Sequence, residues 1–436
     1  MKNLRWWSVI GVAAMGATLA GCGKSDSSGN VSLRIANATL THPSIDLLIN
    51  AVVSVPAVAA DAVSGYVTPG SGANTLQIDN AGSSTSLYAA APTLTSGAHY
   101  TLLAYESGGA VKAVTLGEDL VVPPAGAVTL RIYDAAIEAG KLDVYLIPDA
   151  TTTTGSTSPC HSLTGVAPTT SFGTLTAPAA SASTAGPGTY RVCVTAGGNN
   201  VDLRLDMPGV TFISQQVATV ILTPAAGGLL INGSTLIQQG AYSAVRNTST
   251  RVRLAAAVAS NANVDASAST GETISAGSVA PAFGTYALVP ASSTLTIHVN
   301  GQSIGAPATA LVPGGDMTLL VYGPAVGATA SLLVDDNRPP SDPTTVKLRL
   351  INGITGAAGA LSLSANSVSV ASAIAPGQGS TGYVSVGVIS GTTTQLTLQA
   401  SNHAGDLLSQ SATLLPNTVY TVMGAGDASA PQMLIR

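Results

Sequence analysis

Residues 31–50 read VSLRIANATLTHPSIDLLIN, and this pattern returns three more times along the chain. Its core is an arginine between two apolar residues, Leu33-Arg34-Ile35. The later copies are Leu130-Arg131-Ile132, Val252-Arg253-Leu254 and Leu348-Arg349-Leu350. A spacing of roughly 95 to 120 residues lets each copy bury a core of its own, so four tandem domains are predicted.

An aspartate follows the arginine by 12 residues in three copies, and Leu361 takes its place in the fourth. Alternation points Arg34 and Asp46 away from the core of their strands, and a hairpin would set them opposite each other. Such a cross-strand ion pair is worth up to about 1 kcal/mol. We predict three structural ion pairs, with a ligand site as the alternative: Arg34 with Asp46, Arg131 with Asp143, and Arg253 with Asp265.

The composition favours strands over helices. Charged residues make up 8% of the chain, whereas roughly 25% is typical of globular domains. The residues that usually fill the solvent face of a helix are scarce, while Ser, Thr, Val and Gly prefer strands or turns. The predicted fold class is therefore all-β.

The charge excludes a nucleic-acid partner. The net charge of −5 becomes −7 once Lys2 and Arg5 are removed with a signal peptide. No basic stripe is present, and both tryptophans, Trp6 and Trp7, lie in the N-terminal segment, which leaves no aromatic stacking platform.

Residues 1–22 read MKNLRWWSVIGVAAMGATLAGC and have the form of an export signal. Leu19-Ala20-Gly21-Cys22 resembles the lipobox of bacterial lipoproteins, which implies that Cys22 receives a lipid and becomes the new N-terminus. The alternative, an uncleaved anchor over residues 6–21, is shorter than the roughly 20 residues that span a bilayer. Because Gly23 follows the cysteine, the resemblance implies the outer membrane in a diderm bacterium.

The expected organisation has six parts. They are a signal peptide (1–21), a polar tether (22–30) and four modules, 31–124, 125–246, 247–340 and 341–436. Residues 151–168 form a Thr/Ser-rich insertion in module 2. Pro123-Pro124 and Pro339-Pro340 lie near module ends and hold an extended backbone, so the array is expected to be a stiff string rather than one globule.

Two cysteines remain after Cys22 in an exported chain. Cys160 lies in the insertion and Cys193 lies in a strand-like alternation. We predict a disulfide between them, which would stabilise the module by roughly 3–4 kcal/mol on the chain-entropy model. Two buried thiols are the alternative.

Two aromatic motifs also recur. Gly65-Tyr66 is echoed by Gly382-Tyr383, and more loosely by Phe172-Gly173 and Phe283-Gly284. A turn that delivers a tyrosine to the start of a strand occurs at Tyr100 and again at Tyr420. Such a turn is similar to the tyrosine corner of sandwich folds, whose ring packs inward and whose hydroxyl bonds to backbone.

Together these motifs resemble the bacterial domain of unknown function 4397, found in tandem in exported proteins and lipoproteins. Module 1 matches best, while module 4 lacks the aspartate and module 3 has Ala256 in place of an asparagine. The resemblance implies β-sandwich domains and no activity. The expected fold is a tandem array of four antiparallel β-sandwiches, Ig-like or transthyretin-like. The residues that carry the match are Leu33, Arg34, Asn37, Ala38, Asp46, Gly65, Tyr66, Gly97, Tyr100 and Thr101.

Two chemical motifs are weighed and set aside. The pentapeptide 301–305 fits the G-x-S-x-G nucleophile elbow around Ser303, but no helical period follows it, so an Asn300-Gly301 hairpin turn explains it better. Asp335-Asp336-Asn337 with Asp342 suggests a Ca²⁺ loop, yet lacks an ordered ligand spacing. The histidines show no metal-ligand spacing, and no metal or cofactor is expected.

The predicted function is a non-catalytic, membrane-anchored lipoprotein of the cell envelope that acts as a structural, adhesive or interaction scaffold. Its expected partners are the membrane, through the lipid, and an envelope protein or a glycan. A carbohydrate-binding surface protein is the main alternative, weakened because no tryptophan follows residue 22. A serine hydrolase that rests on Ser303 is the third.

Overall fold

The computed structural model describes residues 30–149, 158–356 and 358–436. Cys22, the signal peptide and most of the tether lie outside the described residues, as do residues 151–157 of the insertion. The regular secondary structure of the described residues consists of strands apart from two short 3₁₀ helices, which confirms the all-β class. None of their helices is long and apolar enough to cross a bilayer.

Module 1 is a sandwich of two main sheets, β1-β8-β9 and β3-β2-β5-β6, with a small β4-β7 ribbon. Val31, Leu33 and Ile35 on one face of β1 pack against Ile45 and Leu47 of β2, as the alternation predicts. The strands are β1 (Ser32–Ala38), β2 (Ser44–Ile49), β3 (Val52–Ala59), β4 (Gly72–Ala73), β5 (Leu76–Asn80), β6 (Ser86–Ala90), β7 (Thr93–Leu94), β8 (His99–Ser107) and β9 (Ala110–Gly117).

Module 2 has the sheets β13-β10-β16-β17-β18 and β12-β11-β14-β15. Two short 3₁₀ helices interrupt it, η1 (Ile137–Ala139) and η2 (Pro159–His161). Its strands are β10 (Val128–Asp134), β11 (Leu142–Pro148), β12 (Thr170–Phe172), β13 (Ala179–Ala185), β14 (Gly188–Ala196), β15 (Asn199–Phe212), β16 (Val217–Pro224), β17 (Ile231–Ile237) and β18 (Tyr242–Val245).

Modules 3 and 4 repeat the plan. In module 3, β22-β19-β26-β27, with β23 also paired to β19, faces β21-β20-β24-β25; in module 4, β31-β28-β34-β35 faces β30-β29-β32-β33. The strands are β19 (Ser249–Ala256), β20 (Asn263–Ala268), β21 (Thr273–Val279), β22 (Ala282–Phe283), β23 (Ala287–Pro290), β24 (Leu295–Val299), β25 (Gln302–Ile304), β26 (Asp316–Tyr322), β27 (Thr329–Asp335), β28 (Thr345–Asn352), β29 (Leu361–Ala365), β30 (Val368–Ile374), β31 (Val384–Gly387), β32 (Thr393–Ala400), β33 (Asp406–Thr413), β34 (Thr418–Ala425) and β35 (Gln432–Ile435).

One parallel pair recurs in every module within the otherwise antiparallel sheets. The first strand of each module lies parallel to a strand near the module's end. The pairs are β1 with β8, β10 with β16, β19 with β26, and β28 with β34. The strand that carries the repeated arginine is thus joined to residues far away in the sequence.

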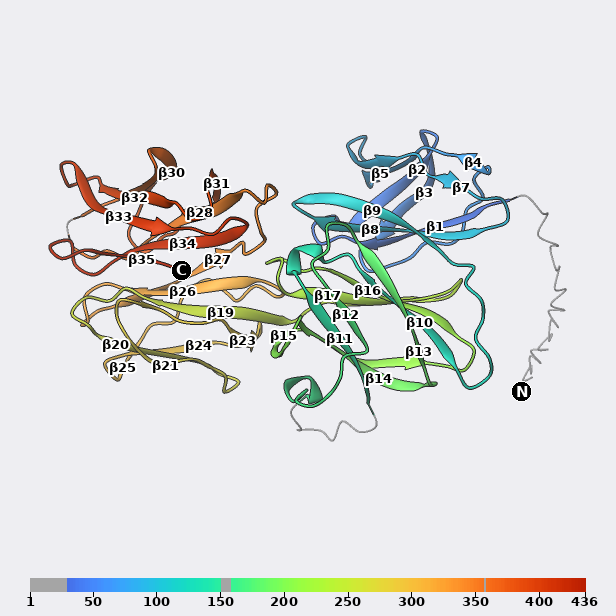
Figure 1. The fold of residues 1–436 in the computed structure, drawn as a ribbon, viewed down its shortest axis with the longest axis horizontal. Helices are drawn as coiled ribbons and strands as arrows, with labels where there is room; N and C mark the ends of the chain where they lie inside the picture. Colours follow the sequence, from blue (N-terminus) through green and yellow to red (C-terminus); the bar gives the residue numbers. More distant parts are fainter. Residues whose placement is uncertain (1–29, 150–157, 357) are drawn as a thin grey trace, which may run out of the picture.

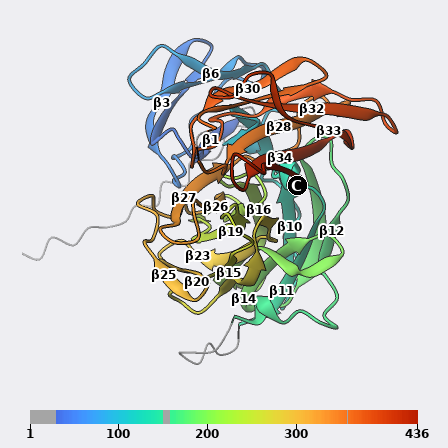
Figure 2. The same ribbon diagram turned by 90° about the vertical axis from the view of Figure 1, so that its left-hand side faces the viewer.

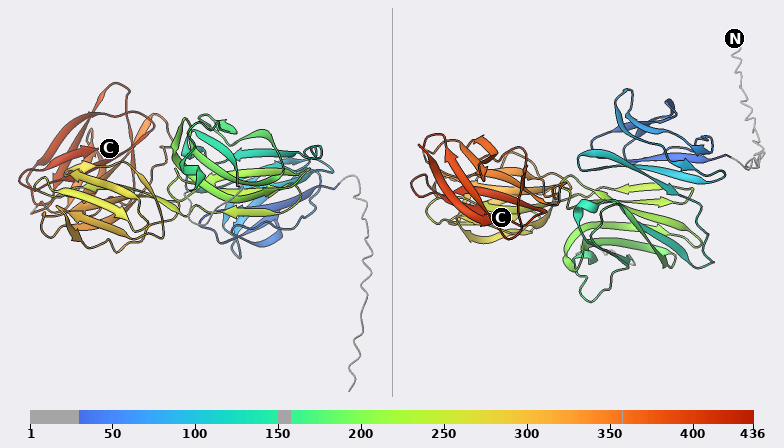
Figure 3. Two further views of the ribbon diagram at one scale, coloured as in Figure 1. Left: turned by 90° about the horizontal axis from the view of Figure 1, so that it is seen from below. Right: turned by 45° about the horizontal axis from the view of Figure 1, so that its top comes forward.

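The modules pack face to face in two pairs, so the prediction of a string is wrong. Figure 1 shows module 1 (blue) above module 2 (green) and module 4 (red) above module 3 (yellow), and Figures 2 and 3 show the same pairs from other sides. In each pair the two sheets with the repeated arginine meet. Apolar residues from both modules close the contacts: Ala36, Leu103 and Leu116 with Tyr133, Ile221 and Leu236, and Ala255 and Leu320 with Ile351 and Met423.

The two pairs touch through glycines of modules 2 and 3. Gly227 donates its backbone N–H to the carbonyl of Gly314 at 3.0 Å. A Cβ on Gly227 would lie 2.7 Å from the amide nitrogen of Asp316, and one on Gly228 would overlap the side chain of Arg338. This close approach needs residues without side chains.

Candidate functional site: an arginine junction between modules

The repeated arginine faces the partner module, not its own core. Leu33 and Ile35 point into the sandwich, so alternation turns Arg34 outward. Module 2 covers that outer face and leaves Arg34 4% exposed. Arg253 and Arg349 meet across the second contact and are buried as well. We call each meeting place, with its arginines and their partners, a junction.

A threonine on the parallel strand holds each arginine. The two residues are direct cross-strand neighbours in all four modules, and the arginine Nε atom donates to the threonine hydroxyl. The Nε to Oγ1 distances are 2.9 Å for Arg34–Thr101, 3.0 Å for Arg131–Thr219, 3.0 Å for Arg253–Thr318 and 3.3 Å for Arg349–Thr421.

An acidic residue completes the unit in modules 1 and 3. Thr101 pairs with Leu116 across the strands, and Glu118 lies two residues after Leu116. In the same way Thr318 pairs with Leu333, and Asp335 lies two residues after Leu333. Glu118 accepts from Arg34 Nη2 at 2.8 Å, and Asp335 accepts from Arg349 Nη2. Gln238 takes this place in module 2.

Aromatic rings cover three of the arginines. Tyr66 lies over Arg34 with 4.9 Å from Cζ to the ring centroid, and Tyr383 lies over Arg349 at 5.1 Å. Phe283 and Tyr286 cover Arg253 at 5.1 and 4.9 Å. Burial raises the pKa of the Tyr66 and Tyr286 hydroxyls, which donate to Glu118 and Asp335, and raises the pKa of Tyr383 to about 12. The glycine–aromatic motif therefore supplies the cover of the arginine.

Phe172-Gly173, the looser repeat of this motif in module 2, does not cover an arginine. Phe172 packs in the core of module 2 instead. Arg131 has β13 alongside, with Ala182 as its neighbour. Its second contact is the carbonyl of Gly117 in module 1 at 3.4 Å, and burial lowers its pKa.

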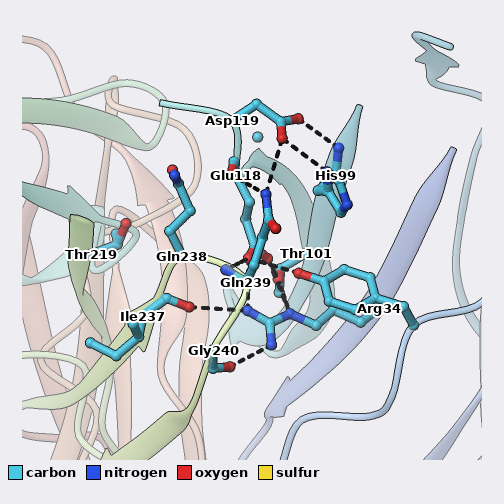
Figure 4. A network of polar contacts seen from close by, with 12 residues as sticks. Arg34, His99, Thr101, Glu118, Asp119, Thr219, Ile237, Gln238, Gln239 and Gly240 are labelled. Carbon is cyan, nitrogen blue, oxygen red and sulfur yellow. Dashed lines mark hydrogen bonds and ion pairs between the residues drawn. The ribbon is translucent and has the colours of Figure 1, made fainter. Parts of the chain in front are cut away.

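The junctions bind the modules together through these same groups. Figure 4 shows Arg34 reaching the turn after β17, where it donates to the carbonyls of Gly240 at 2.5 Å and Ile237 at 3.2 Å. Gln239 N–H of that turn donates to Glu118 at 2.5 Å. Such charge-assisted bonds are shorter and stronger than neutral ones.

The second junction is reciprocal. Arg253 of module 3 donates to Thr421 of module 4 at 2.8 Å, and Arg349 of module 4 donates to Thr318 of module 3 at 3.2 Å. Arg349 also forms the ion pair with Asp335 of module 3, whose side chain has no exposed surface. Each of these two arginines therefore binds both its own module and the other module of the pair.

The three predicted Arg–Asp ion pairs do not form. β1 and β2 belong to opposite sheets of the sandwich, so Arg34 and Asp46 project from opposite outer faces. Asp46 instead accepts from Ala57 N–H at 2.6 Å and Gly82 N–H at 3.1 Å. The other two aspartates are likewise engaged apart from Arg131 and Arg253: Asp143 accepts from Gly198 N–H at 2.7 Å, and Asp265 binds His298 at 2.8 Å.

The true partners of the arginines are not among the predicted residues, although the sequence carries a signal for them. Glu118-Asp119 and Asp335-Asp336 both precede a proline pair. Their repetition at the module ends marks the acids that bind the arginines. The threonines carry a weaker signal, since Thr101 and Thr421 directly follow the recurring tyrosines.

Three residues after the arginine, a buried side chain organises a turn. Asn37 Oδ1 accepts from Thr39 N–H, and its Nδ2 donates to two carbonyls. Asn352 does the same in module 4. In module 2, Asp134 accepts from Ala136 N–H at 2.8 Å, but its buried Oδ2 has no hydrogen-bond partner among the described residues. Burial raises the pKa of Asp134 to about 6.

The tyrosine corners and the disulfide agree with the sequence. The Tyr100 and Tyr420 hydroxyls accept from the backbone N–H groups of Thr95 and Leu415, at 3.2 and 3.0 Å. Cys160 and Cys193 form a disulfide with a Cα–Cα distance of 5.4 Å. It attaches the described part of the insertion to β14.

Ser303 lies in a row of polar residues on one sheet of module 3. Asn300-Gly301 forms the turn between β24 and β25, both residues with positive φ. Across the strands, Ser303 faces His298, which faces Asp265. His298 binds Asp265, yet no hydrogen bond joins Ser303 to His298 within the described part of the chain. An activated nucleophile typically lies within hydrogen-bond reach of its base.

The acidic loop considered for Ca²⁺ has its carboxylates directed to different partners. Asp335 binds Arg349, Asp336 binds Arg338 at 2.6 Å, and Asp342 binds Thr344 at 2.7 Å. Over residues 30–149, 158–356 and 358–436, no three His, Cys, Asp or Glu side chains gather as a metal site.

Comparison with known protein families gives a match that includes module 1. Residues 31–145 match the family described as "Domain of unknown function (DUF4397)", in agreement with the resemblance seen in the motifs. The match covers module 1 and reaches β11 of module 2. A comparison with the curated proteins finds no match.

The similarities to solved structures are weak. The Bacillus anthracis TIE protein is 8% identical with a TM-score of 0.15, over 67% of this chain and 50% of that chain, so this chain spans half of its length. A "putative cell adhesion protein" from Bacteroides uniformis is 13% identical with a TM-score of 0.19, over 48% of this chain and 99% of that one.

Proposed function

We propose that the protein is a non-catalytic scaffold of the cell envelope, whose four modules present a fixed surface to an envelope protein or a glycan. The observation that carries the proposal is the use of the repeated polar residues. Arg34, Arg253 and Arg349 are buried and bind neighbouring modules. The polar residues that recur most regularly in the chain therefore join its modules to one another.

The sparse charge supports the same role. With charged residues at 8% of the chain, few groups remain for acid–base chemistry once the junctions are formed. Ser303 has a histidine beside it but no hydrogen bond to it among the described residues. A serine hydrolase thus stays the third hypothesis.

The anchor is part of this proposal. Leu19-Ala20-Gly21-Cys22 supports lipidation at Cys22, and Gly23 supports attachment to the outer membrane if the source is a diderm bacterium. Metabolic labelling with a radioactive fatty acid is expected to mark the wild-type protein and to fail in Cys22→Ala. Label that persists in Cys22→Ala contradicts the anchor and leaves the scaffold role open.

The scaffold role is tested with residues 22–436 as bait against envelope extract and a glycan array, beside a broad esterase and peptidase screen. We expect a saturable envelope partner and no turnover. Turnover that disappears in Ser303→Ala but persists in the matched variant Ser409→Ala, on β33 of module 4, would establish a hydrolase instead. Saturable glycan binding without a protein partner would favour the carbohydrate-binding alternative.

A further inference from the structure

A pocket of about 570 Å³ opens where modules 2, 3 and 4 meet. β15 of module 2 forms one wall, and β19 with residues 284–288 of module 3 forms another. Arg436 of module 4 completes the lining. Pockets of about 300–1,000 Å³ are the size that encloses small ligands.

The lining is rich in positive charge for a chain with so few charged residues. Arg251, Arg253 and Arg436 all line the pocket, and Asp202 is the acidic side chain in its lining. Asp202 is already paired with Arg204 at 2.7 Å. The lining therefore has no carboxylate side chain free to pair with its arginines.

Arg251 and Arg253 each have guanidinium N–H groups that make no hydrogen bond among the described residues. The guanidinium of Arg251 makes no hydrogen bond within the described residues, and its nearest carboxylate is Asp316, 3.5 Å from Nε. Arg253 uses Nε on Thr318 and Nη2 on Thr421, and its Nε also lies 3.6 Å from the Asp335 carboxylate. Its Nη1 has no partner in that same part of the chain.

The other junction arginines give a matched comparison. In Arg34 and in Arg349, all three guanidinium nitrogens donate hydrogen bonds. Arg253 stands at the same repeat position but lines a pocket, and it is left with an unused donor. An oxyanion in the pocket could accept a hydrogen bond from this donor in place of water.

Rings and neutral groups shape the rest of the site. Tyr286 lies against Arg251 at 4.6 Å and against Arg253 at 4.9 Å, which orients both guanidinium planes. Asn199 and Thr285 add neutral hydrogen-bonding groups, and Leu203 adds an apolar patch.

We propose that this pocket binds a small hydroxylated ligand that carries a carboxylate or a phosphate, with sugar acids and sugar phosphates as the class. The planar fork of arginine matches both oxyanions with paired hydrogen bonds. The neutral side chains suit hydroxyl groups, and the leucine suits the apolar face of a sugar ring. This binding activity goes beyond the scaffold role.

Calorimetry on residues 22–436 at low salt tests the proposal with three probes: glucuronate, glucose 6-phosphate and glucose. We expect saturable binding of at least one anionic probe, at least about tenfold tighter than glucose. The stronger of the two anions identifies the group that the pocket prefers.

Variants locate the binding. Arg251→Lys keeps the charge but loses the fork, and Arg436→Gln removes an exposed charge; each is expected to weaken binding at least about fivefold. Val201→Glu adds a negative charge at a rim residue that is 77% exposed, and should weaken it without a folding defect. Lys112→Gln, an exposed charge on β9 of module 1, is the control and should leave the affinity unchanged.

Three outcomes would overturn the proposal. They are no binding of either anion up to about 10 mM, equal affinity for glucose, and equal weakening by Lys112→Gln and Arg436→Gln. The last would mean that the net charge of the protein, not this pocket, attracts the anion.

Discussion

Arg34 on β1 donates its Nε–H to the hydroxyl of Thr101 on β8 at 2.9 Å, across a parallel pair of strands. The same arginine–threonine pair stands in each of the other modules. Because the pair lies on the outer face of its sheet, the remaining guanidinium nitrogens are free to bind the neighbouring module. The repeat therefore encodes a contact between domains.

The contact between modules 2 and 3 should be sensitive to a single methyl group. Gly228→Ala would overlap Arg338 and strain a φ of +82°. Gly405→Ala is the matched control, with a φ of +78° and no atom within 4 Å of the added Cβ. We expect the control to lose about 1 kcal/mol of stability through backbone strain, and Gly228→Ala clearly more. Equal losses in chemical denaturation would show that the contact with Arg338 contributes nothing.

Asp134 should make the protein less stable as the pH rises. Its pKa is raised from 3.8 to about 6 in the folded state, so between these values the folded state holds a proton that the unfolded state has lost. The linked free energy of unfolding therefore falls as the pH rises from about 4 to about 6, by about 3 kcal/mol in total.

Asp134→Asn removes this dependence, because an amide is uncharged at every pH and so has no charge to desolvate in this buried position. The variant should match the wild type near pH 4 and exceed it in melting temperature at pH 7. A difference that stays constant between pH 4 and pH 8 would be inconsistent with a protonated Asp134.

The disulfide should stabilise module 2 by about 3–4 kcal/mol. The loop between Cys160 and Cys193 has a sequence separation of 33 residues, and both cysteines are buried in a cluster that includes Leu288 of module 3. Cys160→Ala/Cys193→Ala should lower the stability in chemical denaturation, and dithiothreitol should then have no further effect. Unchanged stability of the double variant would argue against this role.

The sequence was a good guide to local structure. Alternation around Arg34 placed its neighbours in the core, the turns before Tyr100 and Tyr420 form the expected corners, and the two cysteines pair. Each of these features is fixed by neighbours in the sequence or by the absence of another partner. They need no knowledge of how the sheets stack.

Long-range partners were beyond that reasoning. The 12-residue spacing predicts that Arg34 pairs with Asp46, yet the chain crosses to the opposite sheet between them. Its true partners, Thr101 and Glu118, arrive 67 and 84 residues later. A period-two pattern shows that a side chain leaves its own core, but it does not reveal whether water or another module covers it.

The central claim is that the repeated arginines hold neighbouring modules together, and Arg349–Asp335 is its most direct test because the pair joins module 4 to module 3. Arg349→Met alone should cost up to about 3–5 kcal/mol, since it removes the nearer of the two arginines that face the buried Asp335 carboxylate and leaves only Arg253, with its Nε 3.6 Å away. A double-mutant cycle of Arg349→Met and Asp335→Leu, measured by chemical denaturation, should give a coupling energy of about 1–3 kcal/mol. The reference cycle of Arg34→Met and Asp46→Asn should give a coupling energy within about 0.5 kcal/mol of zero. Additive effects at Arg349 and Asp335, or a strong coupling at Arg34 and Asp46, would contradict the account.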